Sequence, residues 1–133
     1  MVSVRQTPDD GALCVTIMND RSSREYLDRT GGSPFASWFG HLNPKAAAKV
    51  ATAVARLAAG NFSNVKGVGS VVFEYRIDFG PGYRIYFGKD GERLVIVLAG
   101  GSKKRQQRDI EGALANWQDY KRRKKEDGDG ADA

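Results

Sequence analysis

Two consecutive stretches in the first half of the chain carry apolar residues at the spacing of a helix. In the first these are Phe35, Trp38, Phe39 and Leu42, and in the second Ala47, Val50, Ala51, Val54, Leu57 and Ala58. Each stretch follows a capping residue and a proline, Ser33-Pro34 and Asn43-Pro44, and Gly60-Asn61 ends the second. The pattern predicts a helical hairpin whose second helix, rich in alanine, packs closely on a sheet.

The second half of the chain has the two-residue alternation of β-strands. Strands are predicted at residues 71–79, 83–88 and 92–99, the last of them almost entirely apolar. The turn sequences Gly80-Pro81-Gly82 and Lys89-Asp90-Gly91 separate them, so the three form an antiparallel meander. Residues 12–18 and 22–27 are further strand candidates, of which we expect the second to join the sheet, and residues 61–69 are expected to form a loop.

The alternation places charged residues on one face of this meander. Phe73, Tyr75, Ile77 and Phe79 share one face of the first strand, and Glu74, Arg76 and Asp78 share the other. In the second strand Arg84 and Tyr86 point away from Tyr83, Ile85 and Phe87. Arg76 and Arg84 are therefore expected on the same polar face of adjacent strands, in a register that a slip of one residue would break.

A third helix is predicted near the C-terminus and is followed by a charged tail. Ile110, Leu114 and Trp117 form its apolar stripe, which fits a helix over residues 106–120. Residues 121–125 are all Lys or Arg, and the acidic, glycine-rich remainder is expected to be disordered. The predicted organisation is an N-terminal extension (1–21), one α+β domain (22–124) and a disordered tail (125–133). Its sheet is mainly antiparallel, with an N-terminal helical hairpin and a C-terminal helix.

Composition narrows the classes of function. A chain of 133 residues has room for one hydrophobic core, and its net charge of +5 suits nucleic acid or an acidic protein partner. Cys14 and His41 are the only residues of their kinds, so we expect no intrachain disulfide, no metal site and no cofactor. No apolar run approaches the length of a membrane span, and Asp9 and Asp10 stand where a signal peptide would need its apolar core. These features predict a cytoplasmic protein without a membrane partner.

Cations gather directly after the last predicted strand. Gly100-Gly101 is followed by Lys103, Lys104, Arg105 and Arg108, and these residues together with Arg76 and Arg84 could hold a phosphate chain. The alternative is a solvated strand face on which the two arginines pair with Asp78 or Glu74. Tyr86 could stack on a base or cover the sheet. Lys121, Arg122 and Arg123 could contact RNA or the ribosome nonspecifically, or could simply keep the protein soluble.

Several segments resemble one protein family. They are Ser33-Pro34-Phe35 before Trp38-Phe39, Arg56-Leu57 with Gly60-Asn61-Phe62, Val65-Lys66, the run from Tyr75 to Phe87, and Gly100-Gly101-Ser102-Lys103-Lys104 leading to Gln107, Asp109 and Ile110. Together they resemble the RelE/ParE superfamily of toxins from type II toxin–antitoxin modules, in particular its HigB-like addiction-module killer branch. The resemblance covers roughly residues 24–124, and its most specific part is the Arg-x3-Gly-Pro-Gly-Tyr-Arg-x-Tyr core.

The resemblance implies a small RelE-like toxin that cuts mRNA, usually on the ribosome, without metal, and that a helix-turn-helix antitoxin silences. By position, it implies that Arg84 contacts the scissile phosphate, and that Arg76 and Lys103 or Lys104 match two further basic residues of the catalytic site. Asp78 stands where some members have a second basic residue, and Tyr120 lies too far along the helix to match their C-terminal tyrosine. The alternatives are a ParE-like DNA gyrase poison without catalysis and an inactive module that only binds its antitoxin. The protein is expected as a monomer or as a toxin–antitoxin hetero-oligomer.

Overall fold

The computed structural model describes residues 22–69, 71–91 and 94–132. Along the chain the elements are β2 (Ser22–Glu25), α1 (Pro34–Phe39), α2 (Pro44–Ala58), β3 (Val65–Gly67), β4 (Phe73–Ile77), β5 (Tyr83–Asp90), β6 (Leu94–Ser102), the short 3-10 helix η1 (Lys103–Arg105) and α3 (Gln106–Asp132). The strands form one five-stranded sheet in the order β2-β6-β5-β4-β3. Only β2 runs parallel to its neighbour, so the predicted α+β class with a mainly antiparallel sheet is confirmed.

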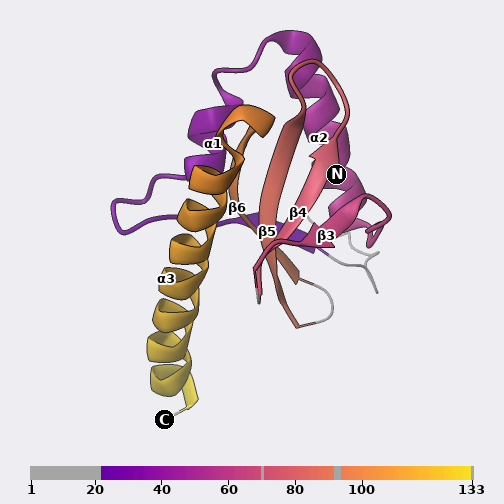
Figure 1. Cartoon of the computed structure of the whole chain (residues 1–133). Coiled ribbons are helices and arrows are strands. Elements are labelled where there is room, and N and C mark those ends of the chain that lie inside the picture. Colours follow the sequence, from indigo (N-terminus) through magenta and orange to yellow (C-terminus); the bar gives the residue numbers. More distant parts are fainter. Residues whose placement is uncertain (1–21, 70, 92–93, 133) are drawn as a thin grey trace, which may run out of the picture.

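Helices cover both faces of this sheet, and Figure 1 shows α3 on one side with α1 and α2 on the other. The core between α1, α2 and the sheet contains Phe35, Val50, Ala53, Leu57, Tyr75, Ile77, Ile85, Phe87, Val95 and Val97. The core under α3 contains Tyr26, Val72, Tyr86, Ile96, Leu98, Ala113 and Trp117. The sheet is therefore the middle layer of three, whereas the sequence predicts an open polar face on the meander.

The helix starts are those that the sequence predicts. The Ser33 hydroxyl accepts a hydrogen bond from the Ala36 amide, and the Asn43 side chain accepts one from the Ala46 amide, both at 2.9 Å. Both caps satisfy amides that have no partner within their own helix. Helix α1 is shorter than expected and ends at Phe39, and the His41 ring nitrogen Nδ1 then donates to the Ser37 carbonyl at 2.7 Å. His41 therefore closes the end of α1, the role that its position predicts.

Two of the predicted boundaries are wrong. The expected loop at residues 61–69 contains the short edge strand β3, which three residues form only because β4 pairs with them. Helix α3 continues to Asp132, well past its predicted end at residue 120, and residues 121–126, directly after that end, are good helix formers. Of the two N-terminal strand candidates the second is confirmed as β2, and residues 12–18 lie outside the described part of the chain.

Glycines let the two helical layers approach the sheet closely. A Cβ built on Gly88 would lie 2.5 Å from the Trp117 ring of α3, and one built on Gly100 would lie 2.1 Å from the Trp38 ring of α1. Because neither distance leaves room for a side chain, each indole packs directly on the strand backbone. Gly100-Gly101 is thus part of strand β6 and makes room for α1 and α3, rather than opening a loop.

Candidate nucleic-acid interface

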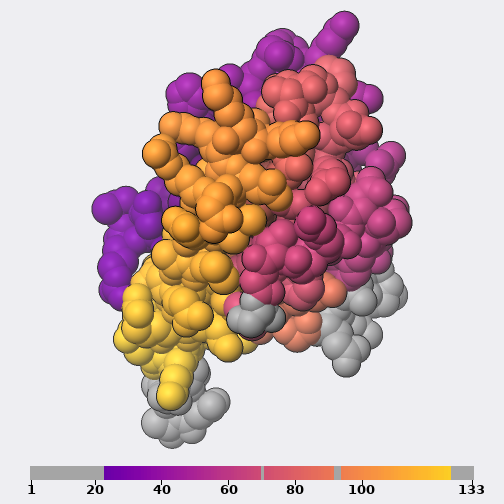
Figure 2. Space-filling view, viewed as in Figure 1, coloured from indigo at the N-terminus to yellow at the C-terminus, as the bar shows by residue number. Residues whose placement is uncertain are grey.

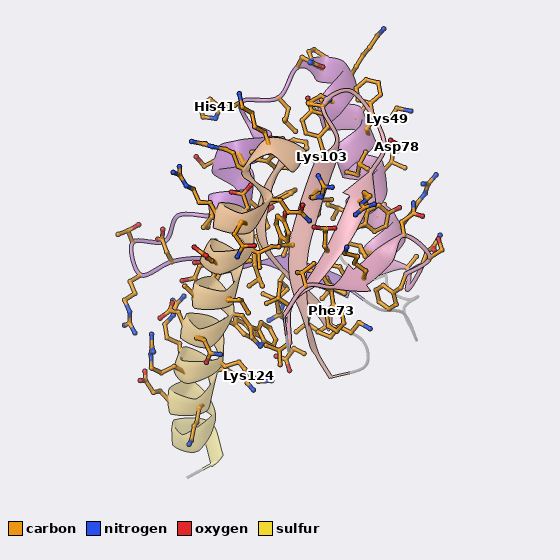
Figure 3. The ribbon with its side chains drawn as sticks, viewed as in Figure 1. His41, Lys49, Phe73, Asp78, Lys103 and Lys124 are labelled. Carbon is orange, nitrogen blue, oxygen red and sulfur yellow. The ribbon has the colours of Figure 1, made fainter. Side chains whose placement is uncertain are left out.

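Arg76 and Arg84 lie directly opposite each other on β4 and β5, as the sequence predicts. The turn between these strands also holds the first residue of η1, because the Lys103 amide donates to the Gly82 carbonyl at 2.8 Å. Three basic residues from separate segments therefore meet at one end of the sheet. Figure 3 shows Lys103 at this end of the sheet, where α3 begins.

The two arginines differ in their access to solvent. The Arg76 side chain is 52% exposed, whereas that of Arg84 is 5% exposed and its Nε lies 3.2 Å from Oε2 of Glu74. Helix α3 covers this part of the face, and the Gln106 amide donates to the same Glu74 oxygen at 2.7 Å. For Arg84 the structure therefore has the predicted alternative, a pair with Glu74, although this pair is buried and not solvated.

Gly82 marks the place where Arg84 comes closest to Lys103. A Cβ built on Gly82 would lie 3.7 Å from the Lys103 Cβ and 3.9 Å from Arg84 Nη1, and this residue has a left-handed φ of 81°. The left-handed φ favours glycine here, whereas both distances are ordinary van der Waals contacts. The Arg84 Nη1 also donates a long hydrogen bond, 3.5 Å, to the Gly82 carbonyl. The end of the guanidinium that is not paired with Glu74 therefore faces the β4–β5 turn and the stem of Lys103.

Tyr86 is fully buried beneath α3, with an exposed fraction of 0%. Its hydroxyl has no hydrogen-bond partner at good geometry among the described residues, and burial, reinforced by the negative charges of Glu74 and Asp109, raises its pKa. A base cannot reach this ring. The RNA-binding prediction for Tyr86 is wrong, and the alternative that it covers the sheet is the one that the structure has.

Asp109 completes a group of polar side chains under the first turns of α3. Its Oδ2 is buried without a hydrogen-bond partner among the described residues, and a Cβ on Gly101 would lie only 1.9 Å from that oxygen. Burial raises the pKa of Asp109, although Arg105 and Arg108 act in the opposite direction. Sequence reasoning assigned no role to Glu74 as a hub, to Gln106 or to Asp109. The signal for Glu74 was its place between Tyr75 and Phe73 in the alternation, but nothing in the sequence shows that α3 covers that face.

The basic residues after β6 are accessible. Lys103, Lys104, Arg105 and Arg108 are all exposed, and within the described segments none of them forms an ion pair. Figure 2 shows the start of α3 and η1, in orange, beside the β4–β5 region in salmon. These four residues and Arg76 thus form a cationic surface, which we call the turn surface, and it contains half of the ten predicted site residues.

The cationic run of residues 121–125 is a separate feature. Arg122 and Arg123 pair with Asp119 at 3.0 and 2.9 Å, and Lys124 pairs with Asp90 at 2.6 Å. Figure 3 shows Lys124 near the far end of α3 from Lys103. Since three of the five cations already have carboxylate partners, Lys121 and Lys125 are those of the run without an ion pair among the residues that the structure describes. These pairs favour the alternative that the run keeps the protein soluble over an RNA contact by Lys121, Arg122 and Arg123.

Within residues 22–69, 71–91 and 94–132, no group of three or more His, Cys, Asp or Glu side chains is placed to hold a metal ion. In the same residues no helix combines the length and the apolar character that crossing a membrane requires.

Comparison with known proteins gives one informative match. No protein-family model matches the chain. A protein of Haemophilus influenzae, described as uncharacterized, is 45% identical over 80 residues, which are 59% of this chain and 81% of the Haemophilus protein. Identity at this level over most of the relative shows common descent and a common fold. The chain therefore belongs to the same protein family as this Haemophilus influenzae protein.

Proposed function

We propose that this protein is the toxin of a type II toxin–antitoxin module and acts as an mRNA endonuclease. The observation that carries the proposal is the meeting of Arg76, Arg84 and Lys103 at one end of the sheet. The order of elements, a strand, two helices, a meander and a helix, supports the resemblance to RelE-like toxins. The net charge of +5 and the unpaired cations of the turn surface favour a polyanionic substrate.

The chemistry of such a cut explains why cations are needed. Attack by the 2′-hydroxyl on the neighbouring phosphate forms a new bond to phosphorus and breaks the bond to the 5′-oxygen, which takes up a proton. The enzyme must place the hydroxyl in line and neutralise the charge of the phosphorane. Arg76, which is half exposed, can grip phosphate oxygens with two parallel hydrogen bonds. Arg84 is buried and its Nε is already paired with Glu74. We therefore assign it an electrostatic role, in which its positive charge acts on the phosphate from within the protein.

The lysines of η1 are the candidates for giving the leaving group its proton. Lys103 is fixed by its backbone to the β4–β5 turn, and Lys104 follows it on the exposed side of the chain. A protonated lysine side chain within hydrogen-bond reach of the leaving oxygen can act as a general acid. We therefore assign proton donation to Lys103 or Lys104. The proposal further includes cytoplasmic action on ribosome-bound mRNA and silencing by a helix-turn-helix antitoxin, both implied by the family resemblance.

The burial of Arg84 and Tyr86 favours a second candidate, a ParE-like gyrase poison that acts by binding alone. With these two side chains buried, fewer groups can contact a phosphate than on an open meander face. Induced expression in bacteria separates the two candidates. We expect translation to stop and primer extension to show new 5′ ends within messages, while plasmid supercoiling stays normal. Intact messages together with DNA double-strand breaks would support the gyrase poison and contradict the endonuclease.

A matched pair of variants tests whether the turn surface performs the cut. Arg76→Ala with Lys103→Ala removes two exposed cations from this surface, and Lys121→Ala with Lys125→Ala removes two from the far end of α3. The first variant should lose at least two orders of magnitude in cleavage rate, because the loss of one transition-state contact alone costs about 3 kcal/mol. The second should cut like the original protein. Equal activity of both variants would place the site elsewhere.

A further inference from the structure

The short length of β3 leaves part of β4 without a neighbouring strand. Strand β3 pairs only with Phe73, Glu74 and Tyr75, and the last backbone bond on this side joins the Arg76 amide to the Asn64 carbonyl at 3.2 Å. Beyond this point the surface is hollowed on both sides of β4. Two adjoining hollows, of about 390 and 240 Å³, share Asn64, Arg76 and Asp78 as lining residues. We call them together the edge groove.

Cations from three elements line the edge groove. They are Lys49 and Arg56 of α2, Lys66 of β3 and Arg76 of β4, and all four are exposed. Lys49 and Arg56 are seven positions apart, so they lie on one face of the helix, two turns from each other. Because Arg76 belongs both to the edge groove and to the turn surface, the two are continuous.

These cations lack the carboxylate partners that surface lysines and arginines often have. Lys49, Arg56 and Lys66 form no ion pair with any described residue, and the contact of Arg76 with Glu74 is long, at 3.7 Å. The Lys49 ammonium instead lies 5.5 Å from the centre of the Phe79 ring. The acidic groups of the lining are Asp78 and Glu74, so four cations against two carboxylates leave a surplus of two positive charges. Glu74 is also offset by Arg84, which raises the effective surplus.

We propose that the edge groove binds the phosphate backbone of single-stranded RNA and leads the strand to the turn surface. This inference rests on the proposed function, since it takes RNA as the ligand. Unpaired cations along a groove are the feature that follows a nucleic-acid backbone, and an aromatic ring beside them gives bases a surface to contact. Phe79 and Asn64 line the same hollow as Lys49 and Arg56 and supply these contacts. Arg123 and Lys124 also line a hollow, but each of them already has a carboxylate partner, Asp119 and Asp90 respectively.

The test measures RNA binding separately from cutting. The probe is a short fluorescent single-stranded RNA whose 2′-hydroxyls are methylated, so that it cannot undergo internal attack. Its affinity is titrated by anisotropy at several salt concentrations for the original protein, for Lys49→Gln with Arg56→Gln, and for Lys121→Gln with Lys125→Gln. Both variants lose two exposed helix cations, so they have the same net charge. Circular dichroism checks that each is folded.

For the groove variant, we expect the slope of log affinity against log salt to become shallower by about 1.4, which is about 0.7 for each of two lost phosphate contacts. The control variant should keep the original slope. An unchanged slope for the groove variant, an equal change in both variants, or no binding of the probe by the original protein would each overturn the inference. Binding through the groove by a protein that never cuts RNA would contradict the proposed endonuclease alone. Cutting with an unchanged slope would contradict the groove alone.

Discussion

Removing the Glu74 side chain should lower the free energy of unfolding by a large amount for a side chain of this size. Its carboxylate is 1% exposed, pairs with Arg84 Nε at 3.2 Å and accepts a hydrogen bond from Gln106 at 2.7 Å. It thus joins β4, β5 and the first turn of α3. The change Glu74→Ala would leave the Arg84 guanidinium buried without a counter-ion.

The expected loss can be worked out from these contacts. Breaking a buried ion pair by removing one partner costs about 3–5 kcal/mol, because the remaining charge is not solvated. The contact with Arg76 adds little, since that side chain is half exposed and 3.7 Å away. A domain of this size is stable by about 5–15 kcal/mol, so Glu74→Ala would remove a large share of its stability. Arg84→Ala would leave Glu74 uncompensated in the same way.

Equilibrium unfolding in urea at neutral pH measures this loss. A double variant, Glu74→Leu with Arg84→Met, replaces both charges by apolar groups of similar size and should recover most of the stability. The single and double variants together give the coupling energy of the pair. If Glu74→Ala lowers the free energy of unfolding by less than about 1 kcal/mol, the pair contributes no more than a solvent-exposed ion pair does. That result would contradict the buried contacts of Glu74 with Arg84 and Gln106, and would indicate that Arg84 lies on an open face, as the sequence predicts.

Three other changes test the packing and the polar cluster. Gly88→Ala should lower the free energy of unfolding by about 1–3 kcal/mol, because its Cβ would lie 2.5 Å from the Trp117 ring. Gly112 has open space around it, so Gly112→Ala should leave the free energy of unfolding nearly unchanged or raise it by up to about 1 kcal/mol. Unfolding in urea compares the two variants. Asn43→Ala should cost about 1 kcal/mol by removing the cap of α2, and a Tm equal to that of the original protein would contradict this. Burial raises the pKa of Asp109 in the folded state, so its ionisation opposes folding as pH rises above its ordinary pKa. Asp109→Asn should therefore raise stability at neutral pH relative to the original protein. This gain should vanish in acid, below the ordinary pKa of the carboxyl. A gain in stability that does not depend on pH would show that the carboxyl charge is not the cause.

The local features of this fold were predictable because each depends on neighbouring residues. The caps at Ser33 and Asn43, the meander turns and the Arg76–Arg84 register all follow from spacing and turn chemistry. Strand β3 was missed, since three residues without alternation become a strand only through pairing with β4. The length of α3 was underestimated because the apolar stripe ends at Trp117, although the charged residues beyond it favour a helix.

The candidate site was predictable only in part, because it depends on which layer covers which face. The sequence places Arg84 and Tyr86 on the same side as Arg76, and this is confirmed. It does not show that Gly88 and Gly101 let α3 lie close on that side, so it left the face open. The same covering separates the exposed Arg76 from the buried Arg84 and turns Tyr86 into a core residue. The edge groove could not be predicted from the sequence, because it forms only where Lys49 and Arg56 of α2 come beside Asn64 and β4.

The most direct test of the central claim is cleavage of a defined message by the purified protein, with and without ribosomes stalled on it. The products should be mapped to single nucleotides, with the original protein compared to Arg76→Ala with Lys103→Ala. The account predicts cuts within the message whose upstream fragments end in a 2′,3′-cyclic phosphate, as attack by the 2′-hydroxyl requires, and their loss in the variant. An intact message under both conditions, or unchanged cutting by a folded variant that lacks both cations, would contradict the proposal.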